Sequence, residues 1–105
     1  MEFNKEWQPA EPGVRRRIVT VGRQMMSMIV EFEAGAEGYV HSHPHEQTTY
    51  VIRGEFAFTI DGTVHQVREG DTLYIPSDAK HGVTAVTAGA LFDTFTPIRE
   101  DLLKR

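Results

Sequence analysis

The chain has 105 residues, a formal net charge of −4 and no cysteine. Its length allows one domain with a core of its own, and the missing cysteines exclude disulfides, thiolate metal sites and a cysteine nucleophile. Charges and two prolines within residues 1–13 argue against a secretory signal, and no apolar run is long enough to span a membrane. We therefore expect one cytoplasmic domain over residues 1–105, with an N-terminal arm over 1–13 and no membrane partner.

A basic triplet, Arg15-Arg16-Arg17, opens the first predicted strand. In a strand, Arg15 and Arg17 point to one side and Arg16 to the other. The triplet is therefore not a single phosphate-binding patch, and we expect no nucleic-acid partner. It fits a solvated edge strand that charge protects against pairing with another chain. The alternative is that one of the three arginines points inward and meets an anion.

Glycine and proline are spread evenly along the chain, and the segments between them are short and rich in β-branched and aromatic residues. This pattern is typical of an antiparallel all-β sandwich or barrel. The predicted strands are Arg15–Val21, Gln24–Phe32, Tyr39–His43, Thr48–Arg53, Glu55–Ile60, Thr63–Arg68, Thr72–Ile75, Gly82–Val86 and Ala90–Thr96. A short helix is expected only in residues 99–105.

Alternation along the strands assigns their faces. The second predicted strand has one wholly apolar side, which we expect in the core and not as a methionine ligand set: Met26, Met28, Val30 and Phe32. Asp61-Gly62 favours a type I′ hairpin turn between two strands, because both central residues of that turn need positive φ.

Two histidines, His41 and His43, are separated by one residue. In a strand this spacing places both imidazoles on one face, with Cα atoms roughly 6.5–7 Å apart, so that they can share an ion. Pro44 ends that strand because it cannot donate to a ladder, and Gln47 then opens the next strand beside His43. A further histidine, His81, follows a second turn.

The spacing of these residues resembles the two cupin motifs. The first motif spans residues 35–54 and is matched by Gly35, His41, His43, Gln47 and Gly54, with Gln47 where glutamate is usual. The second motif spans residues 70–85 and is matched by Gly70, Pro76 and His81, with Asp78 in place of glycine and Ala85 in place of asparagine. The resemblance implies a cupin double-stranded β-helix, or jelly-roll barrel, that is helix-poor and has a short C-terminal tail.

The same resemblance implies one divalent transition metal ion, held by His41, His43, Gln47 and His81. Zn, Ni, Mn, Fe and Cu all suit such a ligand set. Because the Gln47 amide is neutral, the ion keeps its full charge and is a stronger Lewis acid than a glutamate ligand would allow. The alternative is a chance cluster of surface histidines. Of the other two histidines, His45 is a candidate rim residue and His65 is expected to face solvent.

The last predicted strand carries Asp93 and Phe95 on one face. If this face lines the barrel, a carboxylate stands in an apolar interior, where it is costly unless it has a partner or a task. The alternative is that the face points to water.

The end of the chain is similar to that of the pectin-degradation cupins, through HPHEQ in the first motif and through Asp93, Phe95, Pro97, Arg99, Glu100 and Asp101. These are small metal-dependent proteins that open the ring of unsaturated monouronates to the linear ketone. The resemblance implies a small anionic sugar-acid substrate. It also implies Asp93 as general acid and base, Phe95 as an apolar wall and Arg99 on the uronate carboxylate. For Arg99 the alternative is a surface pair with Glu100 or Glu69.

Two other functions remain open from the sequence. One is a different metal-dependent cupin enzyme, a dioxygenase or a sugar isomerase, since a three-histidine site can serve several chemistries. The other is a non-catalytic cupin that binds a small molecule. The resemblance to cupins of this size further implies a homodimer, with residues 1–11 as a segment for exchange with the partner.

Overall fold

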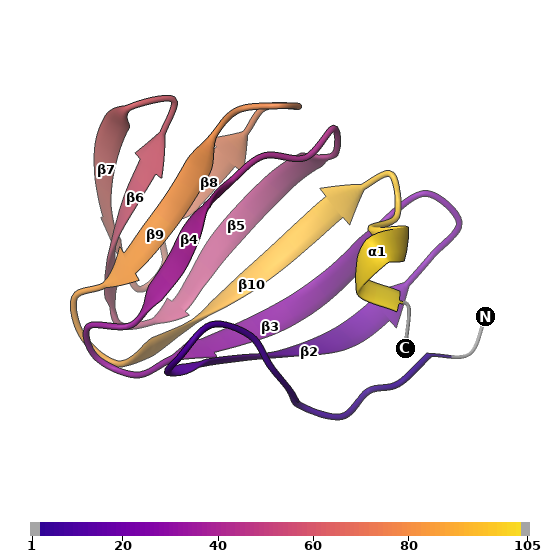
Figure 1. The fold of residues 1–105 in the computed structure, drawn as a ribbon, viewed down its shortest axis with the longest axis horizontal. Helices are drawn as coiled ribbons and strands as arrows, with labels where there is room; N and C mark the ends of the chain where they lie inside the picture. The colour runs from indigo at the N-terminus through magenta and orange to yellow at the C-terminus, as the bar shows by residue number, and fades with distance from the viewer. Residues whose placement is uncertain (1–2, 104–105) are drawn as a thin grey trace.

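The fold is built almost entirely from antiparallel strands (Figure 1). The computed structural model describes residues 3–103, so the ends of the expected arm and of the expected C-terminal helix, residues 1–2 and 104–105, lie outside the described residues. Within that range, no helix has the length and apolarity that crossing a membrane requires. The elements are β1 (Gln8–Pro9), β2 (Val14–Val21), β3 (Met26–Phe32), β4 (Glu37–His41), β5 (Glu46–Arg53), β6 (Glu55–Ile60), β7 (Thr63–Arg68), β8 (Thr72–Ile75), β9 (His81–Ala85), β10 (Gly89–Thr96) and α1 (Glu100–Leu103). The all-β, helix-poor prediction is confirmed.

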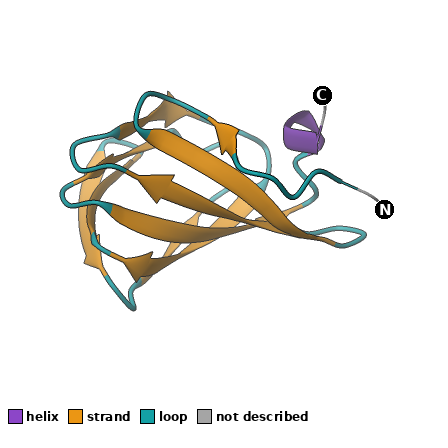
Figure 2. Cartoon of the chain, turned by 90° about the horizontal axis from the view of Figure 1, so that it is seen from below, coloured by secondary structure: helices purple, strands orange, loops and turns teal. Residues whose placement is uncertain are grey.

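Two sheets face each other and enclose the core. The larger sheet has the order β1-β2-β3-β10-β5-β8, and the smaller one has the order β4-β9-β6-β7. Strands that are distant in sequence therefore lie side by side, as in a jelly roll. Figures 1 and 2 show the sheets curving around a common interior, with α1 and the N-terminal segment at the same end of the molecule.

The interior between the sheets is apolar. The buried side of β3 consists of Met26, Met28, Val30 and Phe32, as predicted. From the smaller sheet, Phe56 and Phe58 of β6 join the same cluster. The ring of Phe56 packs edge-on against that of Phe32, with centroids 5.2 Å apart. Removal of this apolar surface from water is the main term that stabilises the fold.

β10 is the strand that positions the polar residues of the interior. It pairs with β3 on one side and with β5 on the other. Asp93 lies opposite Met28 of β3 and Thr49 of β5, and Phe95 lies opposite Gln47 of β5. Residues from separate parts of the sequence thus stand in adjacent rows on one inner surface.

The position of His43 differs from the prediction. β4 ends at His41, so the predicted strand Tyr39–His43 is wrong at both ends and His43 lies in the connection that follows. Pro44 has no amide with which to continue a ladder. The carbonyl of His43 instead accepts a hydrogen bond from the amide of Asp78 at 2.8 Å, which ties this connection to the turn before β9.

Other strand ends differ by one or two residues. β3 starts at Met26 and not at Gln24, because the amide of Gly22 donates to the carbonyl of Met25 at 2.7 Å and closes a turn there. β5 starts two residues before the predicted Thr48, and β2, β9 and β10 differ by one residue. The predicted bounds of β6, β7 and β8 are confirmed.

Two turns contain residues with positive φ, at Asp61-Gly62 and at Asp78. Asp61 and Gly62 have φ of 47° and 83°, which agrees with the predicted type I′ hairpin between β6 and β7. Asp78 has φ of 65°. It replaces a glycine of the second cupin motif, and aspartate is one of the few other residues that adopt this left-handed conformation readily.

β2 is not the edge strand that the sequence predicts, because the short β1 pairs with it at Arg15 and Arg16. The guanidinium of Arg15 lies 4.1 Å from the ring centroid of Trp7, on the outer side. Arg16 shares the opposite face with Val14 and Ile18, both of which are buried. The expected alternation within the triplet is therefore present, with Arg16 on the inner side.

Replacing Phe56 with alanine should lower the free energy of unfolding by about 3–5 kcal/mol, because a fully buried ring would leave a cavity between the sheets. Urea denaturation followed by circular dichroism measures this change. Val64 of β7 is 58% exposed, so V64A is the control and should change the value by less than about 0.5 kcal/mol. Similar losses in both variants would contradict this placement of the core.

Candidate metal centre

Three imidazoles converge where β4 and β9 meet. His41 ends β4 and lies opposite His81, which begins β9. His43 reaches the same place from the connection after β4. One ligand atom from each histidine lies within 4.8 Å of the other two, with His43 and His81 buried and His41 exposed. Three nitrogen atoms at such separations can bind one ion.

One nitrogen of each ring is held by a backbone carbonyl. His41 Nδ1 lies 2.8 Å from the oxygen of Tyr39, His81 Nδ1 lies 2.9 Å from that of Ala79, and His43 Nδ1 lies 3.1 Å from that of His45. A carbonyl oxygen only accepts, so Nδ1 carries the proton in His41 and His81. Their Nε2 atoms then have a free lone pair, which is the form in which an oriented imidazole binds a metal. In His43 both ring nitrogens face an oxygen acceptor, because Nε2 lies 3.1 Å from the amide oxygen of Gln47.

The side chain of Gln47 lies beside these rings in a fixed orientation. Its amide nitrogen donates to the hydroxyl of Thr49 at 3.0 Å, and that hydroxyl donates its single hydrogen to Asp93 Oδ1 at 2.7 Å. The amide oxygen of Gln47 is therefore directed at His43 Nε2, at 3.1 Å. A neutral His43 ring has one hydrogen for two oxygen acceptors, the carbonyl of His45 and the amide of Gln47. A cation between His43 Nε2 and the Gln47 oxygen would leave that hydrogen for His45, so the donor set fits a metal ion.

The protonation of the rings favours the same conclusion. Burial lowers the pKa of His81 to about 4, although the hydrogen bond to Ala79 acts in the opposite direction. Burial also lowers the pKa of His43, and the positive charge of Arg99 adds to this effect. Both rings are neutral at pH 7 and need not lose a proton before they bind a cation. Three imidazoles and one amide oxygen suit several divalent transition ions, and these ligands alone do not select one of them.

Asp93 lies on the buried face of β10 and not toward water, with 6% of its surface exposed. Burial raises its pKa to about 6, while the hydrogen bonds with Thr49 and Gln47 and the charge of Arg99 limit the rise. A carboxyl group with this pKa exchanges its proton near neutral pH, which is what a general acid or base requires.

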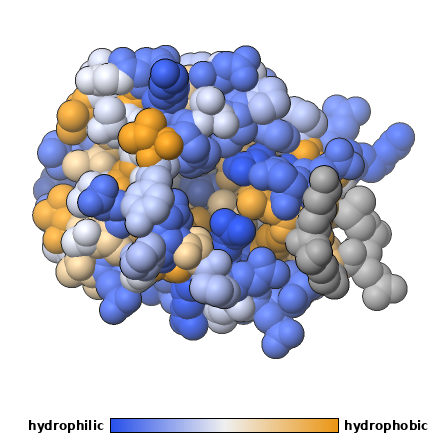
Figure 3. Space-filling view, viewed as in Figure 1, coloured by the Kyte–Doolittle hydropathy of each residue, from blue (hydrophilic) through white to orange (hydrophobic). Residues whose placement is uncertain are grey.

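A cavity of about 270 Å³ opens beside Asp93 and the histidines. Figure 3 shows the molecule hollowed near the centre of this face, over β10 and between β4 and α1. Most of the residues singled out from the sequence line the cavity: His41, Gln47, His81, Asp93, Phe95 and Arg99. Its size is that of a small molecule and not of a polymer.

Arg99 lines the cavity but already has a carboxylate partner. Its Nε and Nη2 atoms donate to Asp101 at 3.1 and 2.8 Å, and this guanidinium lowers the pKa of the Asp101 carboxyl. The guanidinium carbon also lies 5.1 Å from the ring centroid of Phe95. The alternative pair with Glu100 or Glu69 is wrong, because the partner is Asp101.

The remaining histidines are not part of the three-histidine cluster, although the ring of His45 packs edge-on against that of His43, with centroids 5.5 Å apart. His45 Nε2 is hydrogen-bonded to the carbonyl of Ile98 at 3.1 Å, and neither this residue nor His65 of β7 is among those that line the cavity. Sequence reasoning missed Thr49 as a residue of the site, and it left open which arginine of the basic triplet, if any, faces the cavity. Thr49 was signalled only by its place two residues after Gln47 on the same face, and Arg16 only by its alternation with Val14 and Ile18.

A comparison with protein-family models matches residues 28–93 to the cupin domain. This chain belongs to the cupin family. Among curated proteins, this cupin is 35% identical to the pectin degradation protein KdgF of Dickeya dadantii, over 92% of the chain and 90% of the relative. It is 39% identical to the dimethylsulfoniopropionate lyase DddW of Ruegeria pomeroyi, over 67% of the chain and 46% of the relative.

The solved structure of KdgF from a Halomonas species is similar to this cupin throughout. The TM-score is 0.89 at 33% identity, and the match covers 98% of this chain and 99% of the other. The jelly-roll prediction and the resemblance to the pectin-degradation cupins are thereby confirmed.

Replacing His43 with alanine should weaken metal binding by more than the roughly 10–100-fold that loss of an outer hydrogen-bond partner causes, because a direct ligand is removed. Metal content after loading and dialysis, measured by inductively coupled plasma mass spectrometry, tests this. H65A removes a histidine outside the cluster and should bind as much metal as the unmodified protein. Equal metal content in H43A and H65A would disprove the three-histidine centre.

Asp93→Asn should stabilise the metal-free protein at pH 7.5. The pKa of Asp93 is about 6 in the folded chain, above its ordinary value of 3.8, so the folded state binds the proton more tightly. The gain in the free energy of unfolding from this proton is complete below pH 3.8 and is lost as the pH rises through 6. The total change is about 3 kcal/mol. Urea denaturation in EDTA should show D93N to be more stable than the unmodified protein at pH 7.5 and similar to it at pH 3.5. If D93N were more stable than the unmodified protein at both pH values, the charge of Asp93 would not be the cause of the difference.

Proposed function

We propose that this cupin is a metal-dependent enzyme that converts a small unsaturated uronate, of the 4,5-unsaturated galacturonate type, to its linear keto form. The observation that carries the proposal is the buried Asp93, which shares one small cavity with His41 and His81 of the three-histidine cluster. The similarity to a pectin degradation protein over most of both chains supports this class of substrate.

His41, His43, Gln47 and His81 are the proposed ligands of one divalent ion. When bound, the ion would supply Lewis-acid polarisation of a substrate oxygen. The convergence of the three rings and the direction of the Gln47 amide oxygen support this set. The neutrality of all four ligands leaves the charge of the ion available to an anionic substrate.

The reaction is an isomerisation, so nothing is oxidised and no atom is gained or lost. A proton leaves the anomeric hydroxyl, the ring carbon–oxygen bond breaks, and a proton is added to the former alkene carbon as the ketone forms. One group that accepts and then returns a proton suffices for this sequence. Asp93 has a pKa of about 6, and its Oδ1 is occupied by Thr49, so we assign the proton transfer to its other oxygen.

Phe95 and Arg99 complete the proposed site. Phe95 is 1% exposed and lines the cavity, where its ring would exclude water from the reacting carbon atoms. Arg99 lines the same space and is assigned to the uronate carboxylate, for which it would exchange its present partner Asp101. Its planar guanidinium can bind a carboxylate through two hydrogen bonds.

A second candidate is a different metal-dependent cupin enzyme. The similarity to a dimethylsulfoniopropionate lyase over two-thirds of the chain favours it, because that relative is named for a different reaction. Loss of oxygen from solution in the presence of reduced iron would identify a dioxygenase, and ligand binding without turnover would identify a binding protein. The homodimer and the cytoplasmic location remain predictions.

The metal-loaded protein should accelerate the loss of the ultraviolet absorbance of 4,5-unsaturated galacturonate. D93N should lower kcat by at least about 100-fold while it keeps its metal, since proton transfer by a positioned group contributes roughly 10²–10⁴-fold. E69Q, a change to an exposed carboxylate outside the cavity, is the control and should be as active as the unmodified protein. Absence of acceleration with Zn, Ni, Mn, Fe and Cu would refute the proposed reaction.

A further inference from the structure

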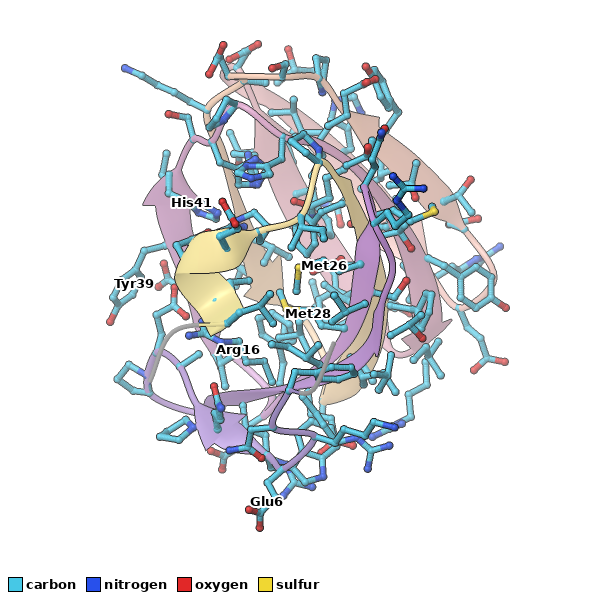
Figure 4. All side chains as sticks on the ribbon, turned by 90° about the vertical axis from the view of Figure 1, so that its right-hand side faces the viewer. Glu6, Arg16, Met26, Met28, Tyr39 and His41 are labelled. Carbon is cyan, nitrogen blue, oxygen red and sulfur yellow. The ribbon has the colours of Figure 1, made fainter. Side chains whose placement is uncertain are left out.

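Arg16 is the residue of the basic triplet that faces the cavity. It lines the same space as His41 and Asp93. Figure 4 looks into the end of the molecule at which α1 lies, and it shows Arg16 near the middle of the view, beside Met28 and below His41. Glu6, by contrast, projects away from the molecule in the same view.

The sheet register places Arg16 at a defined distance from Asp93. Arg16 lies opposite Val30 of β3, which lies opposite Leu91 of β10, two residues before Asp93. The Cα atoms of Arg16 and Asp93 are therefore two strand spacings apart across the sheet and two residues apart along the strand. Together these give a separation of roughly 12 Å. An arginine side chain and one monosaccharide ring together span such a distance.

The charge of Arg16 has no partner in the described part of the chain. Within residues 3–103 it forms no salt bridge and no side-chain hydrogen bond, whereas Arg15 pairs with Glu31 at 2.7 Å and Arg99 pairs with Asp101 at 2.8 Å. Glu11 also lines the cavity, but its carboxylate accepts a hydrogen bond from the amide of Tyr39 at 2.9 Å and forms no salt bridge with Arg16.

The guanidinium of Arg16 is also accessible from the cavity. Within residues 3–103, the buried side-chain nitrogens that lack a hydrogen-bond partner are Arg17 Nε and His45 Nδ1. The nitrogens of Arg16 also lack a partner but are not among these buried atoms, so they are accessible. Among the described residues, the cavity therefore has a cation without a partner, Arg16, on the β2 side.

We propose that Arg16 forms an anion subsite that holds the carboxylate of the sugar acid, with the sugar ring extending toward Asp93 and the three histidines. A carboxylate matches the planar guanidinium in geometry and charge, and it would satisfy donors that have no partner in the described chain. Arg99, which is assigned to the same carboxylate above, would first have to release Asp101, to which it donates twice, whereas Arg16 needs no such exchange within the described chain. The inference rests on the proposed function for the class of ligand.

Isothermal titration calorimetry of the metal-loaded full chain with galacturonate and glucuronate tests the subsite without turnover. R16Q should raise the Kd for the acid at least about tenfold, as expected when a charged hydrogen-bonded contact is lost. R16K keeps the charge but not the planar fork, so its Kd should lie between those of R16Q and the unmodified protein. Galactose has the ring without the carboxylate and should not distinguish R16Q from the unmodified protein.

R15Q is the matched control, because Arg15 is the neighbouring arginine on the outer face of the same strand. Its Kd should stay within about twofold of the unmodified value. Equal values for R16Q and R15Q, weaker binding in R99Q alone, or no binding of either hexuronate by the unmodified protein would overturn the subsite. Should R16Q not fold, an R16K value equal to that of R15Q would overturn it as well.

These outcomes are separate from those that test the reaction. Hexuronate binding that depends on Arg16, without conversion of the unsaturated uronate, would refute the proposed reaction and support the subsite. Conversion of the unsaturated uronate, with normal hexuronate binding by R16Q, would support the reaction and refute the subsite.

Discussion

β10 pairs with β5 from Leu91 to Thr96 and places Asp93 opposite Thr49 and Phe95 opposite Gln47. Because side chains alternate along a strand, these four residues face one interior. A register shift of one residue would turn a whole strand face away from the cavity. The hydrogen-bond chain from Gln47 through Thr49 to Asp93 exists only in this register, and it directs the amide oxygen of Gln47 toward the histidines. The candidate metal centre and the candidate acid–base group are therefore parts of one network.

The site contains groups that are costly to bury, and the fold meets most of that cost with hydrogen bonds. Each histidine of the cluster has one nitrogen bound to a backbone carbonyl, and Asp93 accepts from Thr49. The unmet needs are of two kinds. Acceptor atoms converge at the histidines, and the guanidinium of Arg16 on β2 has no partner among residues 3–103. A cation and an anion would meet these needs at opposite sides of one cavity, which is consistent with a metal-dependent enzyme that acts on a small acid.

The predictions from sequence were most accurate where local chemistry decides the structure. The spacing of His41, His43 and His81 within the cupin motifs led to the observed cluster. Alternation placed Asp93 and Phe95 on one face of their strand but left open whether that face points inward. The prediction for His43 was wrong in detail, because its ring joins the cluster from a connection and not from a strand. That connection depends on a hydrogen bond with Asp78, a contact between distant parts of the chain that no local pattern reveals.

The sequence by itself determined the all-β class, the type I′ turn at Asp61 and the shared face of Asp93 and Phe95, and its resemblance to the cupin motifs pointed to the candidate metal ligands, since each depends on alternation, turn chemistry or motif spacing. Only the tertiary structure decided that Thr49 links Gln47 to Asp93, that Arg99 pairs with Asp101, and that Arg16 enters the cavity without a partner in the described chain. The physical reason is that these contacts depend on strand pairing and chain reversal between distant segments. Sequence patterns specify which face of a strand is apolar, but not which residue of another strand will lie opposite.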